Sequence, residues 1–224
     1  MQEELSLELL TPTLRLVNES WAGHVQRLCA GLKAEAVRHD ESDGVRALVA
    51  RLKRTRPSTY QHCVRTARHA RRVGQALGFD ERRLHQVSQT AMMHDIGKIV
   101  VPEWVLSRPR RPTRFERFVL NLHPSFGAML ASYYGLSAEL RIRTQHHHER
   151  WDGRGYPHRL GGEDIPLMAR VVQVADTFDA MIEQREYNSP RTVEDAAAEL
   201  RREAGRQFDP RLVEAFLDTL PKEC

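Results

Sequence analysis

The chain has 224 residues, 41% of them hydrophobic and 29% charged, with a formal net charge of +4. These totals are typical of a soluble globular protein with one large domain, or a domain with a smaller attachment. No apolar run approaches the roughly 20 residues that span a bilayer, and residues 1–8 are acidic where a signal peptide is basic, so we expect a cytoplasmic protein that contacts no membrane.

The positive charge comes almost wholly from arginine, because lysine occurs at only four positions. An arginine-rich surface in contact with water is the default interpretation, although positive charge also steers phosphate-bearing ligands. The basic loop at 108–114 has no regularly interleaved aromatic residues, which argues against a nucleic-acid polymer as partner. The three cysteines are widely spaced without a CxxC pair and predict neither a disulfide framework nor a zinc ribbon.

Residues 1–54 are predicted to form a helical N-terminal segment of unknown role. Apolar residues recur at helical spacing from residue 5, with a polar, glycine-containing break at 39–44. We interpret this segment as a docking or dimerising element, and in the second case the protein is a homodimer.

Two further helices are predicted before residue 100. An apolar stripe begins at Ser58 and is closed by Gly78, and a second helix covers about 80–95 and is stopped by Gly97. The first helix carries His62 near its start, and the second delivers His94 and Asp95 at its end.

The remaining chain also has helical patterns. Thr113 and Glu116 form a capping box for a helix that ends near His123, and Pro124 opens the next. Helices are expected leading into the histidines at 146–148, over 167–181, and after the caps at 192 and 209, with a glycine- and proline-rich loop at 149–166. Since no strand-like alternation occurs, the predicted fold class is all-α.

Imidazole and carboxylate side chains recur at five separated places. Adjacent helical positions point about 100° apart, so packing does not explain three consecutive histidines. The candidate donors are His62, His94, Asp95, His123, His147, His148 and Asp176. Nitrogen and oxygen donors without thiolates favour iron, manganese or catalytic zinc over structural zinc.

Seven donors are too many for one ion that leaves room for water and substrate. They suit two ions about 3.5–4 Å apart, bridged by a carboxylate and a hydroxide, an arrangement that hydrolyses phosphate esters. Each residue alone has another interpretation: His62 or His123 as an ordinary surface or core histidine, His94–Asp95 as a hydrogen-bonded pair, and Asp176 as the partner of an arginine. Together these would require five coincidences.

The segments His94–Lys98 and His147–Pro157 strongly resemble the HD-GYP family, a branch of the HD-domain metal-dependent phosphohydrolases. The resemblance covers about residues 58–220 and includes the stretches around 113, 123, 165, 174–180 and 208–210. It implies an HD-domain helical bundle at 55–224 with a helical N-terminal extension, and a bi- or trinuclear centre that often holds iron. The implied activity is hydrolysis of cyclic di-GMP to pGpG, and often onward to GMP.

By this resemblance the seven donors are the metal ligands, Asp95 is the bridge, and His146 is the additional histidine. Lys98 is expected to assist the scissile phosphate or its leaving oxygen. Tyr156 and Arg185 are expected to contact the nucleotide, and the loop Gly155, Tyr156 and Pro157 to contact a GGDEF-domain protein.

Several positions depart from the family pattern. Ser58 stands where members with a third metal carry a glutamate, which predicts two divalent ions, with iron favoured and manganese or zinc as alternatives. Arg159 replaces a usual glycine, Glu186 a usual proline, and Asn188 a frequent basic residue. These changes concern the substrate, so two alternatives stay open: a phosphohydrolase of another nucleotide, or a non-catalytic module that binds nucleotide or a GGDEF cyclase.

Overall fold

The structure is a computed structural model that describes residues 23, 25–27, 29–32, 40–107, 110–183 and 191–220. Within these ranges the elements of regular secondary structure are all helices, apart from one isolated bridge between Ala204 and Phe208, which confirms the all-α class. The elements are α3 (Glu41–Thr55), α4 (Pro57–Ala76), α5 (Glu81–Met93), the 3-10 helix η1 (Ile96–Ile99), α6 (Glu103–Leu106), α7 (Arg114–Leu120), α8 (His123–Tyr133), α9 (Ala138–Gln145), the 3-10 helix η2 (Gly162–Asp164), α10 (Leu167–Ile182), α11 (Val193–Glu203) and α12 (Pro210–Leu217).

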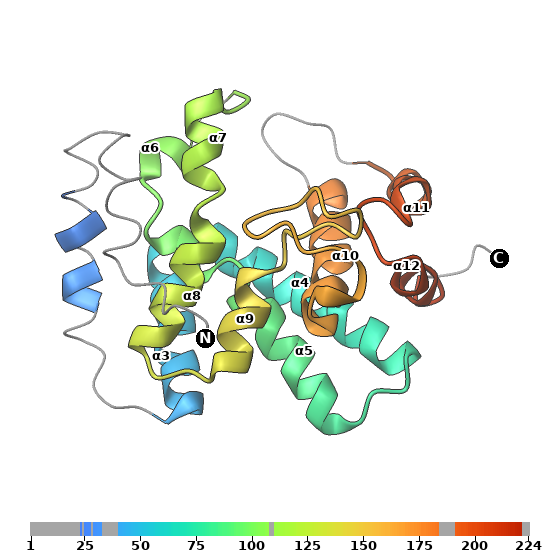
Figure 1. The fold of residues 1–224 in the computed structure, drawn as a ribbon, viewed down its shortest axis with the longest axis horizontal. Helices are drawn as coiled ribbons and strands as arrows, with labels where there is room; N and C mark the ends of the chain where they lie inside the picture. The colour runs from blue at the N-terminus through green and yellow to red at the C-terminus, as the bar shows by residue number, and fades with distance from the viewer. Residues whose placement is uncertain are drawn as a thin grey trace.

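The described residues bury two hydrophobic clusters. One joins α3, η1 and α6–α9, and the other joins α10–α12 with parts of α4 and α5. In Figure 1 these two sets of helices lie on opposite sides of the molecule, and α4 and α5 pass between them. Because α4 and α5 contribute residues to both clusters, these two helices form the boundary between the two sets of helices.

Side-chain caps mark the starts of several helices, although the two longest, α4 and α10, have none. The carboxylates of Asp40, Asp80 and Asp209 accept backbone N–H bonds in the first turns of α3, α5 and α12. The hydroxyl of Thr192 does the same for α11, as predicted. Such caps satisfy N–H groups that have no partner inside the helix and each contribute about 1 kcal/mol.

The predicted capping box at α7 is confirmed. The Thr113 hydroxyl accepts from the Glu116 N–H at 3.2 Å, and the Glu116 carboxylate accepts from the Thr113 N–H at 2.8 Å. Arg110 adds two bonds of 2.8 Å to the same carboxylate. Thr113 therefore fixes where α7 begins, although the helix ends at Leu120, before His123.

Two glycines have roles that the sequence pattern did not indicate. A helix boundary does lie within the expected break at 39–44, because Asp40 caps α3, but Gly44 is already inside this helix. A Cβ on Gly44 would stand 2.5 Å from the Tyr134 carbonyl oxygen, so a glycine is needed there for close packing. Gly97 does not stop α5, which ends at Met93, but lies within η1. A Cβ on Gly97 would overlap the His123 carbonyl and lie 2.6 Å from the Gly127 nitrogen, so only glycine lets η1 approach α8 this closely.

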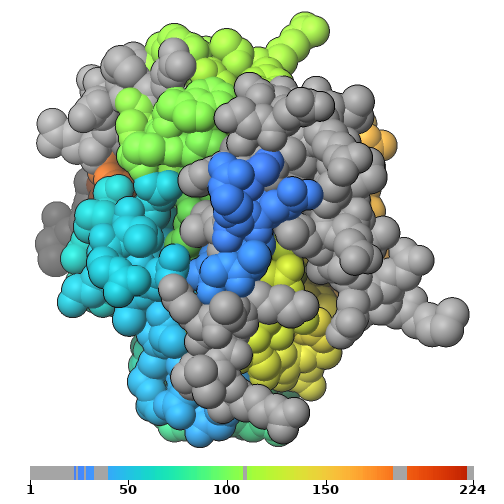
Figure 2. Space-filling view, turned by 90° about the vertical axis from the view of Figure 1, so that its left-hand side faces the viewer, coloured from blue at the N-terminus to red at the C-terminus, as the bar shows by residue number. Residues whose placement is uncertain are grey.

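The described part of the N-terminal segment packs onto the main body. Val25, Cys29 and Leu32 are buried in the same cluster as Leu48 and Leu52 of α3. Figure 2 shows the described residues of 23–32 in blue on the outside of the molecule. The boundary between 54 and 55 stays a prediction, as do docking and dimerisation.

Cys29 and Cys63 are free and buried, in line with the prediction of unpaired thiols, whereas Cys224 lies outside the described residues. Among the helices that the structure describes, none combines the length and the apolar character needed to cross a membrane.

Candidate metal centre

The seven predicted donors lie close together at the boundary between the two hydrophobic clusters. They come from helix ends and from two helix faces: His62 from α4, His94 and Asp95 from the end of α5, His123 from the first residue of α8, His147 and His148 from the turn after α9, and Asp176 from α10. His94, Asp95, His123 and His147 are each at most 3% exposed. Burial of so many polar groups is costly unless they find partners.

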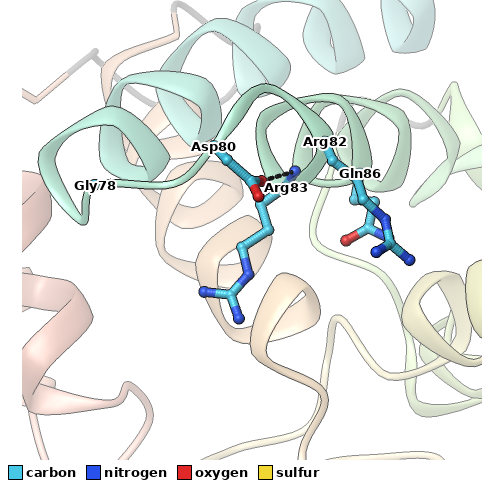
Figure 3. A pocket seen from close by; sticks show the side chains of 5 residues that line it. All are labelled: Gly78, Asp80, Arg82, Arg83 and Gln86. Atoms are coloured by element: carbon cyan, nitrogen blue, oxygen red, sulfur yellow. Dashed lines mark hydrogen bonds between the residues drawn. The ribbon is translucent and has the colours of Figure 1, made fainter.

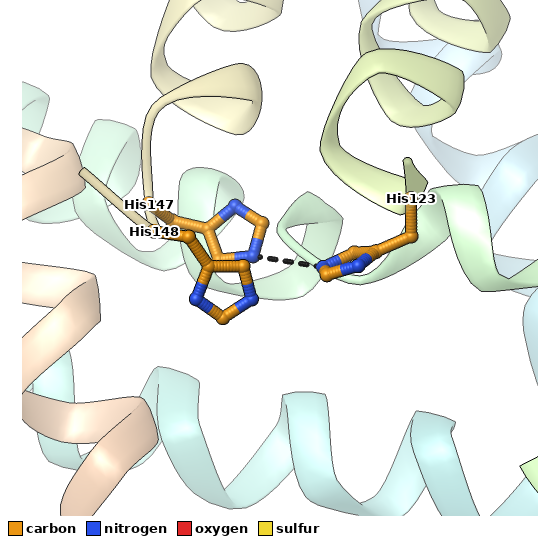
Figure 4. Close-up of side chains that lie close together, drawn as sticks. All are labelled: His123, His147 and His148. Carbon is orange, nitrogen blue, oxygen red and sulfur yellow. Dashed lines mark hydrogen bonds between the residues drawn. The ribbon is translucent and has the colours of Figure 1, made fainter. Parts of the chain in front are cut away.

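The donors divide into two groups. The histidine group consists of His123, His147 and His148, whose side chains face one another in Figure 4. The mixed group consists of His62, His94 and Asp176. Within each group, the nearest ligand atoms all lie within 4.8 Å of one another.

Asp95 lies between the two groups. Its Oδ1 atom is 3.2 Å from Nε2 of His123, in the histidine group. Its Oδ2 atom is 3.5 Å from Nε2 of His94 and 3.9 Å from Nε2 of His62, in the mixed group. One carboxylate therefore offers one oxygen to each group, which is the geometry of a bridging ligand.

The donor spacing fits metal ions better than direct pairing. His94 Nε2 is buried without a hydrogen-bond partner among the described residues, and Oδ1 of Asp176 lies 3.7 Å away, too far for a hydrogen bond. Ligands about 2.1 Å from a shared ion lie roughly 3.0–3.5 Å apart, close to the separations around Asp95. An ion bound by the mixed group would give Nε2 of His94 a partner.

Three of the histidines are oriented by their own chain segments. Nδ1 of His94, His123 and His147 donates at 2.7 Å to the carbonyl oxygen three residues earlier. A carbonyl only accepts, so Nδ1 carries the proton and the lone pair of Nε2 faces the centre. Fixing the tautomer in this way is a common device in metal sites.

His62 is oriented by a different device. Its Nδ1 lies 2.7 Å from Oδ2 of Asp179, and its Nε2 lies 2.8 Å from Oδ1 of Asp176. Arg65 donates to both oxygens of Asp179 at 2.9–3.2 Å and holds that carboxylate in place. The orientation of His62 therefore depends on side chains from α4 and α10.

The charges in the centre differ between the two groups. Burial raises the pKa of Asp176, but the hydrogen bond from His62 and the nearby imidazole of His94 more than offset this, and its pKa is well below the usual value. Burial lowers the pKa of His148 to about 3, with a further contribution from neighbouring His123. Burial also lowers the pKa of His147. His147 and His148 are therefore neutral and can donate lone pairs, whereas Asp176 in the mixed group carries a negative charge.

Lys98 lies beside the bridging carboxylate. Its Nζ donates at 2.6 Å to Oδ2 of Asp95. Burial disfavours the ammonium form, but Asp95 outweighs this effect and the pKa of Lys98 is raised. The Lys98 side chain is 27% exposed, so a positive charge is accessible at the edge of the centre.

The loop after α9 folds back onto the centre. Tyr156 stacks on His148 with the ring centroids 4.9 Å apart, and burial raises the pKa of its phenol, which keeps it protonated. Gly155 is buried, and a Cβ there would stand 2.5 Å from Glu149 Cα and 2.6 Å from the His148 carbonyl. The glycine thus allows the close approach that places Tyr156 over His148.

Some predicted residues lie elsewhere. His146 is directed away from its neighbour His147 and pairs with His158, with Nε2 2.8 Å from Nδ1. Arg185, Glu186 and Asn188 lie outside the described residues. The metal and substrate roles of the other residues stay predictions.

Arg159 adopts a left-handed conformation with φ of 58°. A glycine would occupy this conformation without strain, which gives a physical reason for the glycine usual at that position.

A cavity of about 460 Å³ at the turn between α4 and α5 holds none of the seven donors (Figure 3). It is lined by Gly78, Asp80, Arg82, Arg83 and Gln86, at the opposite end of α5 from His94. The seven candidate metal ligands therefore lie outside this cavity.

Asp179 is the residue of the candidate centre that sequence reasoning left without a role, although it lies 2.7 Å from Nδ1 of His62. Its signal was present, because an acidic residue three positions after Asp176 shares a helix face with it, and both interrupt an otherwise apolar stripe. What the sequence could not indicate is that His62, 117 positions away, would be its partner.

Comparisons with known proteins indicate the family of this chain. A family model described as HD domain matches residues 46–212. The cyclic di-GMP phosphodiesterase response regulator RpfG of Xanthomonas campestris pv. campestris is 42% identical over 65% of this chain and 39% of its own length. The 3'3'-cGAMP-specific phosphodiesterase 2 of Vibrio cholerae serotype O1 is 34% identical over 71% of this chain and 31% of its own length. The chain thus spans less than half the length of these curated relatives.

A solved structure shares the fold. Bd1817, an HDG"Y"P protein from Bdellovibrio bacteriovorus, matches with a TM-score of 0.60 and 19% identity over 71% of this chain and 51% of that chain. This likeness supports the helical bundle that the sequence predicts.

Proposed function

The chain belongs to the HD domain family, in its HD-GYP branch, and on that premise we propose that it hydrolyses a phosphodiester bond of a cyclic dinucleotide. We propose cyclic di-GMP as the substrate, with pGpG and then GMP as products, because the relatives include an enzyme named for this activity. The observation that carries the proposal is Asp95, with one oxygen toward each of two donor groups.

The donor set is suited to two ions, iron foremost, with manganese or zinc as alternatives. Such ions would supply Lewis acidity and activate water for attack at phosphorus. The histidine group would hold one ion and the mixed group the other, with Asp95 shared between them. The lone pairs already face the centre, so little reorganisation is needed on binding.

Other residues would position the substrate. The Lys98 ammonium is accessible beside Asp95 and would attract a phosphate oxygen or stabilise the leaving oxygen. The protonated phenol of Tyr156, above His148, is a hydrogen-bond donor at the same edge. A nucleotide contact by Arg185 and docking of a GGDEF-domain protein on the loop Gly155, Tyr156 and Pro157 remain further parts of the proposal.

The decisive experiment is a product assay on the full chain, purified without oxygen and loaded with iron or manganese. Cyclic di-GMP should be converted to pGpG or GMP, and Asp95→Ala should reduce turnover on the order of 10³-fold because both groups lose their shared ligand. Asp218→Asn, an exposed carboxylate on the last turn, is the matched control and should keep full activity. Equal turnover by Asp95→Ala and the wild type would contradict the proposal.

A second candidate substrate is another cyclic dinucleotide. The relatives also include an enzyme specific for 3'3'-cGAMP, which is 34% identical over 71% of this chain. Side-by-side kcat/KM values for cyclic di-GMP and 3'3'-cGAMP would decide between them. A ratio favouring 3'3'-cGAMP would replace the substrate and leave the reaction class intact.

A further inference from the structure

A second set of metal-type donors lies outside the seven-donor centre. His146 at the end of α9, Glu149 in the following turn and His158 in the loop offer ligand atoms that all lie within 4.8 Å of one another. We propose that these three residues form a separate site for a transition-metal ion such as Zn²⁺. The proposal does not depend on the proposed activity, because none of the three residues belongs to the centre that would carry it.

His146 presents a prepared ligand atom. Its side chain is buried, and its Nδ1 donates to the Ile142 carbonyl at 2.7 Å. The lone pair of Nε2 therefore faces away from the helix, toward Nδ1 of His158 at 2.8 Å. This is the same orientation of the imidazole by a backbone carbonyl that His94, His123 and His147 show.

Glu149 supplies the third donor and is held by the same loop. The residue is fully buried, and its two oxygens accept the N–H groups of His158 at 2.7 Å and Leu160 at 3.1 Å. Each carboxylate oxygen has a second lone pair, so these bonds leave capacity for an ion. The backbone bonds fix the carboxylate, as hydrogen bonds to ligand side chains do in established metal sites.

The chemistry of the three donors favours zinc over magnesium or calcium. Two imidazole nitrogens and one carboxylate are a known zinc ligand set that leaves a fourth position for water. Two nitrogens bound to one zinc ion lie about 3.3 Å apart, since each bond is about 2.0–2.1 Å long and the angle is near tetrahedral. His158 is exposed on the loop, so it can move by the required half ångström and gives an ion a path from solvent.

The alternative is that the two histidines bind no ion. In that case Nδ1–H of His158 donates to Nε2 of His146, and this hydrogen bond only holds the loop against the end of α9. The two cases differ in metal content, which makes them separable by experiment.

The first measurement is the zinc content of the full chain after equilibrium dialysis against Zn²⁺, determined by elemental analysis. His158→Ala and His146→Ala should each contain about one equivalent less than the wild type. His85→Ala, an exposed histidine on α5, is the matched control and should contain as much as the wild type. Equal zinc content in all four proteins would overturn the proposal.

A second variant tests whether a change in metal content arises at the proposed site or indirectly at the seven-donor centre. In His158→Cys the new thiolate can replace the imidazole as a ligand, so a Co²⁺-loaded sample should show a stronger thiolate-to-cobalt charge-transfer band than the wild type, in which Cys63 already lies near His94 and Asp95. His85→Cys should show no such increase. An unchanged spectrum in His158→Cys would also overturn the proposal, whatever the zinc content shows.

Discussion

The two donor groups of the centre are oriented partly by different means, because His94 of the mixed group is held by a backbone carbonyl, as in the histidine group, whereas His62 is held by a side chain. In the histidine group, His123 and His147 are held by carbonyl oxygens only three residues earlier, so the local chain encodes their orientation. In the mixed group, His62 depends on Asp179, and Asp179 depends on Arg65. Substitutions elsewhere in the chain should therefore leave the orientation of the histidine group unchanged. Substitution of Asp179, which is not one of the seven donors, should disturb the mixed group.

The largest expected effect comes from the residue that the two groups share. Asp95→Asn removes one anionic bridge, and we expect it to lower both metal content and turnover, the latter on the order of 10³-fold. Elemental analysis and the product assay on the same sample would test this. Retention of two ions with full turnover would show that Asp95 does not join the groups.

Gly97→Ala tests the histidine group through the backbone of His123, which Gly97 approaches closely. The added Cβ would overlap the His123 carbonyl, so η1 and α8 must separate. We expect a loss of about 1–3 kcal/mol in the free energy of unfolding, measured by urea denaturation of the metal-free protein. Gly78→Ala is unsuitable as a control because of its positive φ, whereas Gly31→Ala meets no atom within 4 Å and should not lose stability in this way.

Asp179→Asn tests the mixed group through a residue that is not one of the seven donors. The amide removes the charge that orients His62, so we expect a 10–100-fold loss of affinity for one ion and little change for the other. Calorimetric titration with Mn²⁺ should resolve the two steps. An equal loss in both steps would mean that the groups are not oriented independently.

The smallest effect concerns a local contact in which none of the seven donors takes part. Bonds from Arg110 and from the Thr113 backbone lower the pKa of Glu116 to about 2, against 4.5 as the ordinary value. Because the folded value is the lower one, this stabilisation is present above pH 4.5 and is lost as the pH falls toward 2. Unfolding at pH 6 and pH 3 should show a smaller difference for Glu116→Gln than for the wild type.

The exposed Glu194→Gln serves as control for the pH experiment and should behave like the wild type. Adding metal should not change the contribution of Glu116, since none of the seven donors belongs to the capping box. A metal-dependent response at Glu116 would contradict the separation of local contacts from the centre.

Much of the centre could be predicted from sequence because its chemistry is carried by residue type and its placement by helix caps. Asp80 and Thr192 mark helix starts through contacts within three residues, and these starts are confirmed. Gly97 was misread because its close approach to His123 joins segments that are not neighbours in the chain. His146 could be recognised as the additional histidine, but its partner His158 could not.

The sequence by itself determined the all-α class, the main helix starts and the set of available donors, since these follow from local hydrogen bonds and side-chain chemistry. Only the tertiary structure decided how the donors divide into two groups, that Asp95 stands between them, and that Asp179 supports His62. The physical reason is that apolar burial drives α4, α8 and α10 together without specifying direction, and the contacts between particular polar atoms follow from how those helices pack.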